Sequence, residues 1–177
     1  MKKLLLLVFF CFQIFVSCNN LWYDTGHKIT GKIGQFFINK NVKEKMKELF
    51  GDENLGEQAV WADEIKRQPE WKFSSTLHYA DFHNNSCSFI PETDCTLPDN
   101  CIVNAIYNYT QRLDKFAHIT QTNQTKEELK TAFRFIIHFL GDIHQPLHIG
   151  RAEDLGGNRI HVHFLGQRKS KFELFLF

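Results

Sequence analysis

Three potential metal ligands, His138, Asp142 and His148, lie within one apolar segment of the chain. His138 and Asp142 are four residues apart, so on a helix their side chains leave from one face, one turn apart. Pro146 lacks a backbone donor, so the helix is predicted to kink or stop there, which would let His148 turn toward the same centre. A carboxylate buried beside imidazoles is costly unless a positive charge neutralises it. The segment therefore predicts a site for a divalent metal ion.

Other segments supply side chains of the same kind, at His27, Asp63, His78 and Asp81. Imidazole and carboxylate without thiolate form the ligand set of catalytic zinc and of harder divalent ions. The α-amine of Trp22 would add a nitrogen ligand if a signal peptide is removed directly before it. Because a metal needs several such groups, their occurrence in separate helical pieces favours one shared site.

Each of these residues also has an ordinary structural interpretation. His78 could be a hydrogen-bonded core histidine, and Asp63 could pair with Lys66, three residues on. His138 and Asp142 could form a buried hydrogen-bonded pair. Four other histidines are interpreted as surface or solvent-facing residues: His83, His118, His161 and His163.

The segments that carry these residues are predicted to be mostly helical. Apolar residues at helical spacing predict helices over four segments: 25–38, 41–50, 59–66 and 101–119. Thr125-Lys-Glu-Glu128 is predicted to be a capping box that begins the helix carrying His138. Residues 77–82 are interpreted as turn or helix, and residues 83–100 as a loop.

After Gly156 and Gly157 the period of the apolar residues changes to two. Ile160, Val162 and Phe164 alternate with polar residues, which predicts a strand that forms half of a hairpin. The predicted fold class is therefore mainly α, with one helical domain and a small β-hairpin.

The composition suits a single globular domain: 177 residues, 43% of them hydrophobic and 23% charged. A formal net charge of +1 excludes a broadly basic surface for a long polyanion, so local cations would have to hold the phosphates of a nucleic acid. The apolar stretch at residues 4–16 is shorter than a membrane-spanning helix requires. We expect a monomer without a membrane span.

Residues 1–21 are predicted to be a secretory signal peptide, because two lysines precede the apolar stretch. Cleavage after Cys18 and cleavage after Leu21 both stay open, and Phe15–Cys18 loosely resembles a lipoprotein box. Export agrees with three glycosylation sequons, and we expect the protein to be secreted or to stay in the secretory or lysosomal-type pathway. The sequons begin at Asn84, Asn108 and Asn123.

Three cysteines follow the signal peptide. Cys95 and Cys101 bracket a short loop and are predicted to form a disulfide in an oxidising compartment. Cys87 is left over, which leaves three interpretations: an intermolecular bond, a free thiol, or a partner missing from this chain.

Taken together, these motifs resemble the S1/P1 nucleases, secreted zinc-dependent enzymes with the phospholipase C/P1 nuclease fold. The resemblance covers nearly all of the predicted nuclease-like domain, residues 22–177, and follows the order of the family. The matching motifs are Trp22-x4-His27, Trp61-Ala-Asp63, His78, His138-x3-Asp142-x5-His148 and Asp154-Leu-Gly-Gly-Asn158.

The resemblance implies a cluster of three zinc ions. Asp63, His78 and His138 would hold one ion, and Trp22 with His27 would hold a second. Asp142 would bridge these two ions, and His148 would belong to the third. Two close zinc ions would make hydroxide available near neutral pH for attack on phosphorus, with the third at the leaving oxygen.

The resemblance also implies a substrate and the residues that contact it. The family hydrolyses single-stranded DNA and RNA to 5′-nucleotides and has 3′-nucleotidase activity. Asp63, Asp142 and Lys66 would take part in catalysis, with Lys66 against the phosphate. Tyr79 would stack on an unpaired base. Three further residues are candidates for the base pocket: Asp81, Leu155 and Asn158.

The match stops after Gly166, where the family continues with a His and an Asp that complete the third zinc site. Neither follows His163 here, and a cysteine that would pair with Cys87 is also absent. We therefore expect the C-terminal part of the domain to be missing, with two zinc ions well held and the third lacking ligands.

Two competing functions share much of this pattern. A zinc phospholipase C has the spacing of His138, Asp142 and His148, but its first histidine lies further from the terminal Trp than His27 lies from Trp22. A truncated, inactive zinc-binding protein of the same family is the second alternative.

Overall fold

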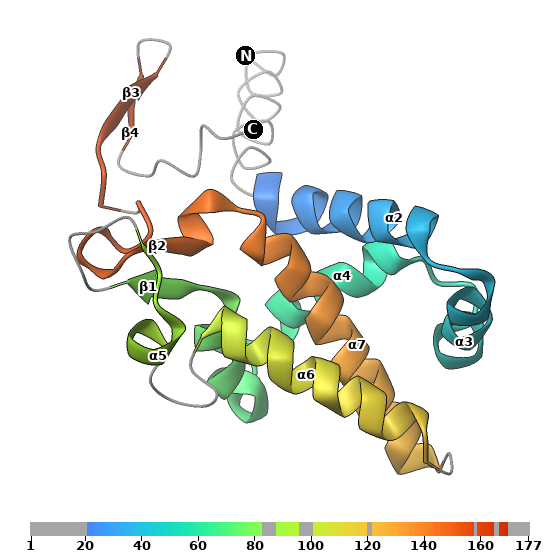
Figure 1. Cartoon of the computed structure of the whole chain (residues 1–177). Coiled ribbons are helices and arrows are strands. Elements are labelled where there is room, and N and C mark those ends of the chain that lie inside the picture. The colour runs from blue at the N-terminus through green and yellow to red at the C-terminus, as the bar shows by residue number, and fades with distance from the viewer. Residues whose placement is uncertain are drawn as a thin grey trace, which may run out of the picture.

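The computed structural model describes residues 21–82, 88–95, 101–119, 122–157, 159–164 and 167–169. Figure 1 shows these residues as a group of helices with short strands at one end. The longer helices are α2 (His27–Phe37), α3 (Lys40–Phe50), α4 (Leu55–Ile65), α6 (Ile102–Ala117) and α7 (Asn123–Ile143). The shorter ones are η2 (Leu21–Gly26), η3 (Pro69–His78), α5 (Pro91–Asp94), η4 (Pro146–His148) and η5 (Ala152–Asp154).

Helix α7 is the central element, and α2, α3, α4 and α6 all pack against it (Figure 1). Its capping box was predicted at Thr125–Glu128, and this is wrong. The Thr122 side chain accepts from the Thr125 amide, and the Thr125 hydroxyl returns a bond to Thr122, so the helix begins one turn earlier. A Thr hydroxyl thus performs the role that Glu usually has. The predicted stop before Pro146 is confirmed, because α7 ends at Ile143.

Two apolar clusters hold the helices together. The larger joins α4, α6 and α7 around Phe135, which is fully buried and stacks between Tyr109 and Phe139. The smaller joins α3, α4 and α7 through residues such as Met46 and Leu129. Burying apolar surface contributes about 25 cal/mol per Å², and this is the main term that stabilises such packing. The prediction of a mainly helical fold is confirmed.

Close approach of α2 to α4 depends on a glycine. A Cβ on Gly31 would lie 2.4 Å from the carbonyl oxygen of Leu55, closer than any real Cβ contact. The N-terminus of α4 is capped by Asn54, whose side chain accepts from the Glu57 amide. This contact matters for the site, because α2 carries His27 at its start and α4 carries Asp63 near its end.

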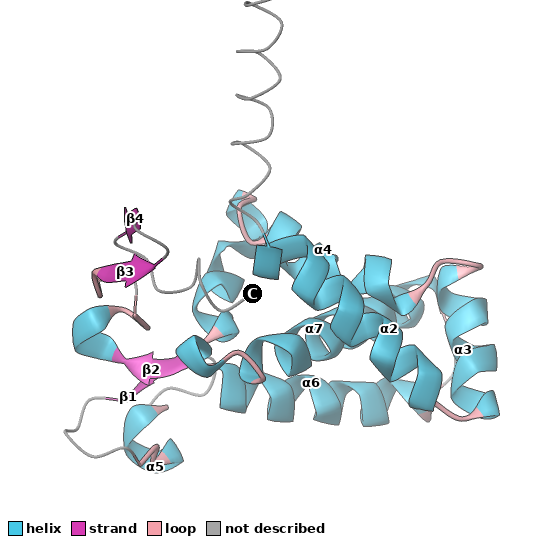
Figure 2. Ribbon diagram, turned by 90° about the horizontal axis from the view of Figure 1, so that it is seen from above, coloured by secondary structure: helices cyan, strands magenta, loops and turns pink. Residues whose placement is uncertain are grey.

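The strands lie at one end of the helices, as Figure 2 shows. Residues 77–82 were interpreted as turn or helix, but β1 (Ala80–Phe82) is a strand that pairs in parallel with β2 (Ile149–Arg151). A three-residue strand has too short a pattern to reveal its period. The predicted hairpin is present as the antiparallel pair β3 (Val162–Phe164) and β4 (Gln167–Lys169).

The predicted disulfide between Cys95 and Cys101 is present and buried, with 5.7 Å between the Cα atoms. Cys87 lies outside the described residues. Among the described helices, none combines the length and the apolar character needed to cross a bilayer.

Two glycines of α2 should respond oppositely to alanine. Gly31→Ala should lower the free energy of unfolding by about 1–3 kcal/mol, because its methyl group would push α2 off the α4 backbone. Gly34→Ala should raise it by about 0.5–1 kcal/mol, since nothing lies within 4 Å and alanine favours the helix. Urea unfolding of both variants measures the difference, and equal effects would contradict the close helix contact.

Candidate metal centre

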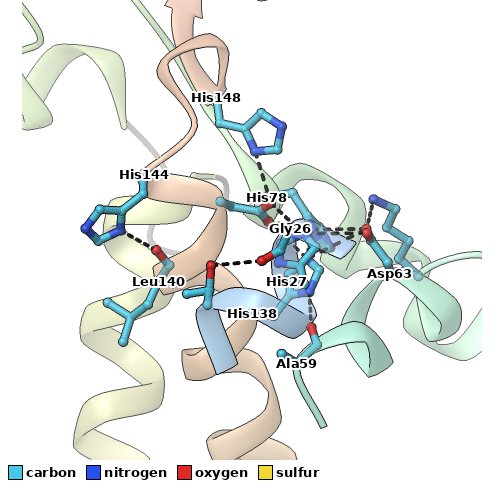
Figure 3. A network of polar contacts seen from close by, with 12 residues as sticks. Gly26, His27, Ala59, Asp63, His78, His138, Leu140, His144 and His148 are labelled. Carbon is cyan, nitrogen blue, oxygen red and sulfur yellow. Dashed lines mark hydrogen bonds and ion pairs between the residues drawn. The ribbon is translucent and has the colours of Figure 1, made fainter. Parts of the chain in front are cut away.

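The buried carboxylate of Asp142 lies within 3.2 Å of four imidazoles. Figure 3 shows the side chains of His27, His78, His138 and His148 gathered in one region. Its Oδ2 is 2.9 Å from Nδ1 of His78 and 3.1 Å from Nε2 of His138. Its Oδ1 is 3.2 Å from Nε2 of His27 and 3.1 Å from Nδ1 of His148. The structure thus brings four histidines from α2, η3, α7 and η4 to one carboxylate.

Asp63 supplies a second carboxylate on the other side of the same imidazoles. Its Oδ1 lies 3.6 Å from Nδ1 of His78 and 3.7 Å from Nε2 of His138, and its Oδ2 lies 3.8 Å from Nε2 of His27. Lys66 also contacts Asp63, as the sequence allowed for an ordinary ion pair. The Lys66 side chain is partly exposed, so its ammonium group stands at the edge of the buried cluster.

The orientation of His138 is set by a backbone carbonyl. Its Nδ1 donates to the carbonyl oxygen of Ala59 at 2.6 Å, which leaves Nε2 to face Nδ1 of His78 at 2.9 Å. A histidine whose far nitrogen donates to a carbonyl is the usual arrangement of a metal ligand. The His138 ring also stacks on His27, with 3.7 Å between the ring centroids.

The position of His27 depends on a glycine in α7, Gly141. A Cβ on Gly141 would lie 2.7 Å from Nδ1 of His27, so only glycine leaves room for this ring beside α7. At the end of α7, the helix stops before Pro146, and the short helix η4 turns His148 back toward Asp142. A continuous helix would have pointed His148 elsewhere.

A partly buried pair, Gln58 and Arg134, supports the α4 segment that holds His138. Arg134 Nε donates to the side-chain oxygen of Gln58 at 2.6 Å, and Gln58 directly precedes Ala59. The guanidinium of Arg134 also lies over the rings of Trp61 and Phe50, 5.1 and 5.3 Å from their centroids. Sequence reasoning missed this pair, because nothing local links Gln58 to a residue 76 positions away.

The cluster is built to attract positive charge. Burial alone would raise the pKa of Asp142, but His138, His148 and His27 outweigh it and hold that pKa well below its usual value. Burial alone would lower the pKa of His138, but Asp142, Asp63 and the Ala59 carbonyl outweigh it and raise that pKa. Burial lowers the pKa of His78 to about 4, although Asp142 partly offsets the effect.

These donor atoms fit a metal ion. Ligand atoms of His78, His138 and Asp142 all lie within 4.8 Å of one another, and those of His27, Asp63 and His138 do likewise. Nitrogens of His138 and His78 that face each other beside two carboxylates need a cation or a shared proton between them. A divalent ion meets that need, and the S1/P1 nucleases, which the motifs resemble, use zinc.

Two predicted substrate residues follow His78 closely in the chain, Tyr79 at the end of η3 and Asp81 in β1. Tyr79 directly follows His78 and is well exposed, and Asp81 is paired in register with Gly150. A Cβ on Gly150 would lie 2.8 Å from the Cα of Gly156, so the turn at residues 155–157 packs over the strand face that carries Asp81.

Leu155 is at the exposed tip of this turn, with a positive φ of 55°. Asn158 lies outside the described residues, as do Asn84 and His83. Trp22 lies in η2, five residues before His27. Asn108 is half-buried in α6, and Asn123 is exposed at the start of α7.

Four of the described histidines lie outside the cluster: His118, His144, His161 and His163. His118, His161 and His163 are exposed, as predicted, and His118 lies 3.5 Å from Asp114 as an ion pair.

Comparisons with known proteins agree with this geometry. The S1/P1 Nuclease family model matches residues 22–174. Endonuclease 3 of Arabidopsis thaliana is 39% identical over 149 residues, which make up 82% of this chain and 50% of that protein. Nuclease P1 of Penicillium citrinum and Nuclease S1 of Aspergillus oryzae are each 32% identical, over 82% of this chain and 53% and 50% of their own lengths.

The chain therefore spans about half the length of the curated relatives it matches. The residues that the family model matches include all six residues of the cluster: His27, Asp63, His78, His138, Asp142 and His148. From the extent of this match and the identity to several relatives, the chain belongs to the S1/P1 nuclease family.

Proposed function

We propose that this protein is a zinc-dependent phosphodiesterase that hydrolyses single-stranded DNA and RNA to 5′-nucleotides and also acts as a 3′-nucleotidase. The observation that carries the proposal is the buried Asp142 with four imidazoles within hydrogen-bond distance. The names of the relatives, which include endonucleases and Nucleases P1 and S1, support the reaction type.

Zinc would be held by the residues that the sequence singled out. Asp63, His78 and His138 would hold one ion, whereas His27 with the amine of Trp22 would hold a second, and Asp142 would lie between them. His148 would belong to a third position, for which the described residues offer fewer ligands. When bound, zinc supplies Lewis acidity that activates water and polarises the phosphodiester.

The other residues would bind and orient the substrate. Lys66 is close enough to the cluster through Asp63 to pair with a phosphate oxygen there. Tyr79 presents an exposed ring beside His78, on which an unpaired base can stack, whereas a paired base is already stacked in its duplex. Asp81, Leu155 and Asn158 would contact the edges of that base.

The proposal includes export and maturation. Residues 1–21 would be removed as a signal peptide, and residues 22–177 would belong to a nuclease domain that acts as a monomer outside the cell or in the secretory or lysosomal-type pathway. Removal directly before Trp22 would expose the amine ligand. Glycans would be carried at Asn84, Asn108 and Asn123.

Zinc affinity at the position formed by Asp63, His78 and His138 should depend on pH through one proton. His138, with its raised pKa, is protonated in mildly acidic solution, whereas His78 is already neutral and Asp142 already ionised. Zinc must displace the His138 proton, so affinity should rise about tenfold per pH unit up to that pKa and then level off. Competition titration with a chelator measures this slope, and a pH-independent affinity would contradict binding through His138.

Gly141→Ala should weaken zinc binding without touching a ligand. Its methyl group would force the His27 ring away from Asp142, so affinity should fall about 10- to 100-fold at the position that includes His27. Gly34→Ala, in open space on α2, is the matched control and should bind zinc like the unaltered protein. Circular dichroism checks that both variants fold, and unchanged zinc stoichiometry and affinity in Gly141→Ala would refute the packing argument.

The reaction itself is tested with labelled single-stranded DNA and RNA, the corresponding duplex, and phosphatidylcholine vesicles. Single strands should be cleaved to products with 5′-phosphates, and a chelator should stop cleavage until zinc is restored. Asp142→Asn should lower the rate at least about 100-fold, because it removes the negative charge at the centre of the four imidazoles. His118→Gln, on the exposed end of α6, should leave the rate unchanged.

The other outcomes identify the competing functions. Two bound zinc ions without cleavage of any substrate would indicate a non-catalytic zinc-binding protein. Turnover of the lipid alone would indicate a phospholipase C.

A further inference from the structure

The helix η3, which ends at His78 of the cluster, exposes one of its edges. Side chains three residues apart eclipse one another in a 3-10 helix, so the ten residues of η3 form three edges. The edge with Ser74 and Leu77 is buried in the core. Another edge carries Phe73 and Thr76, both exposed, and Tyr79 continues it directly after η3 and is also exposed. We call Phe73, Thr76 and Tyr79 the η3 edge.

The ring of Phe73 is partly exposed and partly supported by other rings. It is 56% exposed and lies beside Trp71, with 6.0 Å between the ring centroids. Trp71 in turn contacts Trp61 and the fully buried Phe135, at centroid distances of 5.3 and 5.9 Å. These ring contacts join Phe73 to the core, so its ring is held in place although much of it faces solvent. A fixed, accessible ring can stack on a flat partner with little loss of side-chain entropy.

The spacing of the two aromatic residues on the η3 edge fits a nucleic acid strand. The six positions from Phe73 to Tyr79, at a rise of about 2.0 Å each, separate the two by about 12 Å along the helix. Neighbouring bases of one strand stack about 3.4 Å apart, so these rings would receive bases that are separated by other nucleotides. Only the small side chain of Thr76 lies between the two rings on this edge, which leaves room for those nucleotides.

The charges beside the η3 edge suit a polyanion. Between positions 66 and 79 the chain has three side chains of lysine or arginine and one acid: Lys66, Arg67, Lys72 and Glu70. The side of η3 that carries Lys72 also carries Ser75, whose hydroxyl donates to the carbonyl oxygen of Lys66 at 3.3 Å. Lys66 lies at the cluster and Lys72 directly precedes Phe73, so a strand between these points has a cation near each end. Glu70, one turn before Phe73, would repel a phosphate further on.

We propose that Phe73 is a second base-stacking position for single-stranded nucleic acid, so that the protein favours strands of several nucleotides over dinucleotides. The inference rests on the proposed nuclease activity, because the strand must also reach the cluster. Stacking on aromatic side chains needs an unpaired base, since bases in a duplex are already stacked on their neighbours. Phe73 would bind the strand without taking part in the chemistry, so its removal should raise KM more than it lowers kcat.

The test compares two substrates on the zinc-loaded full chain. A strand of about 12 nucleotides is long enough to reach both rings, whereas a dinucleotide placed at Tyr79 is too short to reach Phe73. In Phe73→Ala, the kcat/KM for the long strand relative to that for the dinucleotide should fall at least about fivefold, chiefly through KM, because one stacked base is lost. Phe73→Leu, which keeps an apolar side chain beside Trp71 without a flat ring, should lose as much. Phe73→Trp should restore the ratio.

Two further variants separate charge from stacking. Lys72→Gln should reduce the slope of log KM for the long strand against log salt concentration by about 0.7, the value for one phosphate contact to a single strand. Tyr107→Ala is the matched control, because it removes a similarly exposed aromatic side chain from α6. It should leave the ratio of the two substrates unchanged.

The remaining outcomes distinguish this inference from the proposed function. An unchanged ratio in Phe73→Ala and Phe73→Leu would overturn the inference, while cleavage by the unaltered chain would leave the nuclease activity standing. Equal losses for the long strand and the dinucleotide would also overturn it, since the ring would then only support the fold. If the unaltered chain cleaves neither substrate, the proposed function fails and the inference falls with it.

Discussion

The rest of this structure depends on a negative charge held out of water. Asp142 is 1% exposed, and its ionised form persists because four imidazoles surround it. Removing a carboxylate from water costs several kcal/mol unless positive charge and hydrogen bonds compensate. The imidazole nitrogens within 3.2 Å of Asp142 supply part of that compensation, and a divalent ion would supply more. The need to neutralise Asp142 therefore makes this cluster suitable for binding a divalent metal ion.

Helix packing is arranged around that requirement. Gly31 lets α2 approach α4, and Gly141 lets the His27 ring lie against α7, so two missing side chains bring three helices to one point. Ala59 contributes only a carbonyl oxygen, yet this oxygen decides which nitrogen of His138 faces the cluster. The pair formed by Gln58 and Arg134 holds the same turn of α4 against α7. Such supporting groups make a site rigid enough to bind a metal tightly.

Much of the site could be predicted from residue types and spacing. The four-residue interval from His138 to Asp142 determines that both share a helix face, and Pro146 determines where that helix must end. Helical periodicity identified α2, α3, α6 and the second half of α4 for the same local reason. Even the disulfide between Cys95 and Cys101 follows from their proximity in sequence.

Tertiary structure alone decided the long-range contacts. Pairing of β1 with β2 joins residues 69 positions apart, from Ala80 to Ile149, and three-residue strands carry no readable period. The capping box of α7 is formed by Thr122 and the hydroxyl of Thr125, whereas the local pattern had favoured Thr125 with the carboxylate of Glu128. Distances among Asp63, His78 and Asp142 depend on how whole helices pack, because side chains from separate elements share no local geometry. Sequence thus determined which groups were available, and packing determined that they meet.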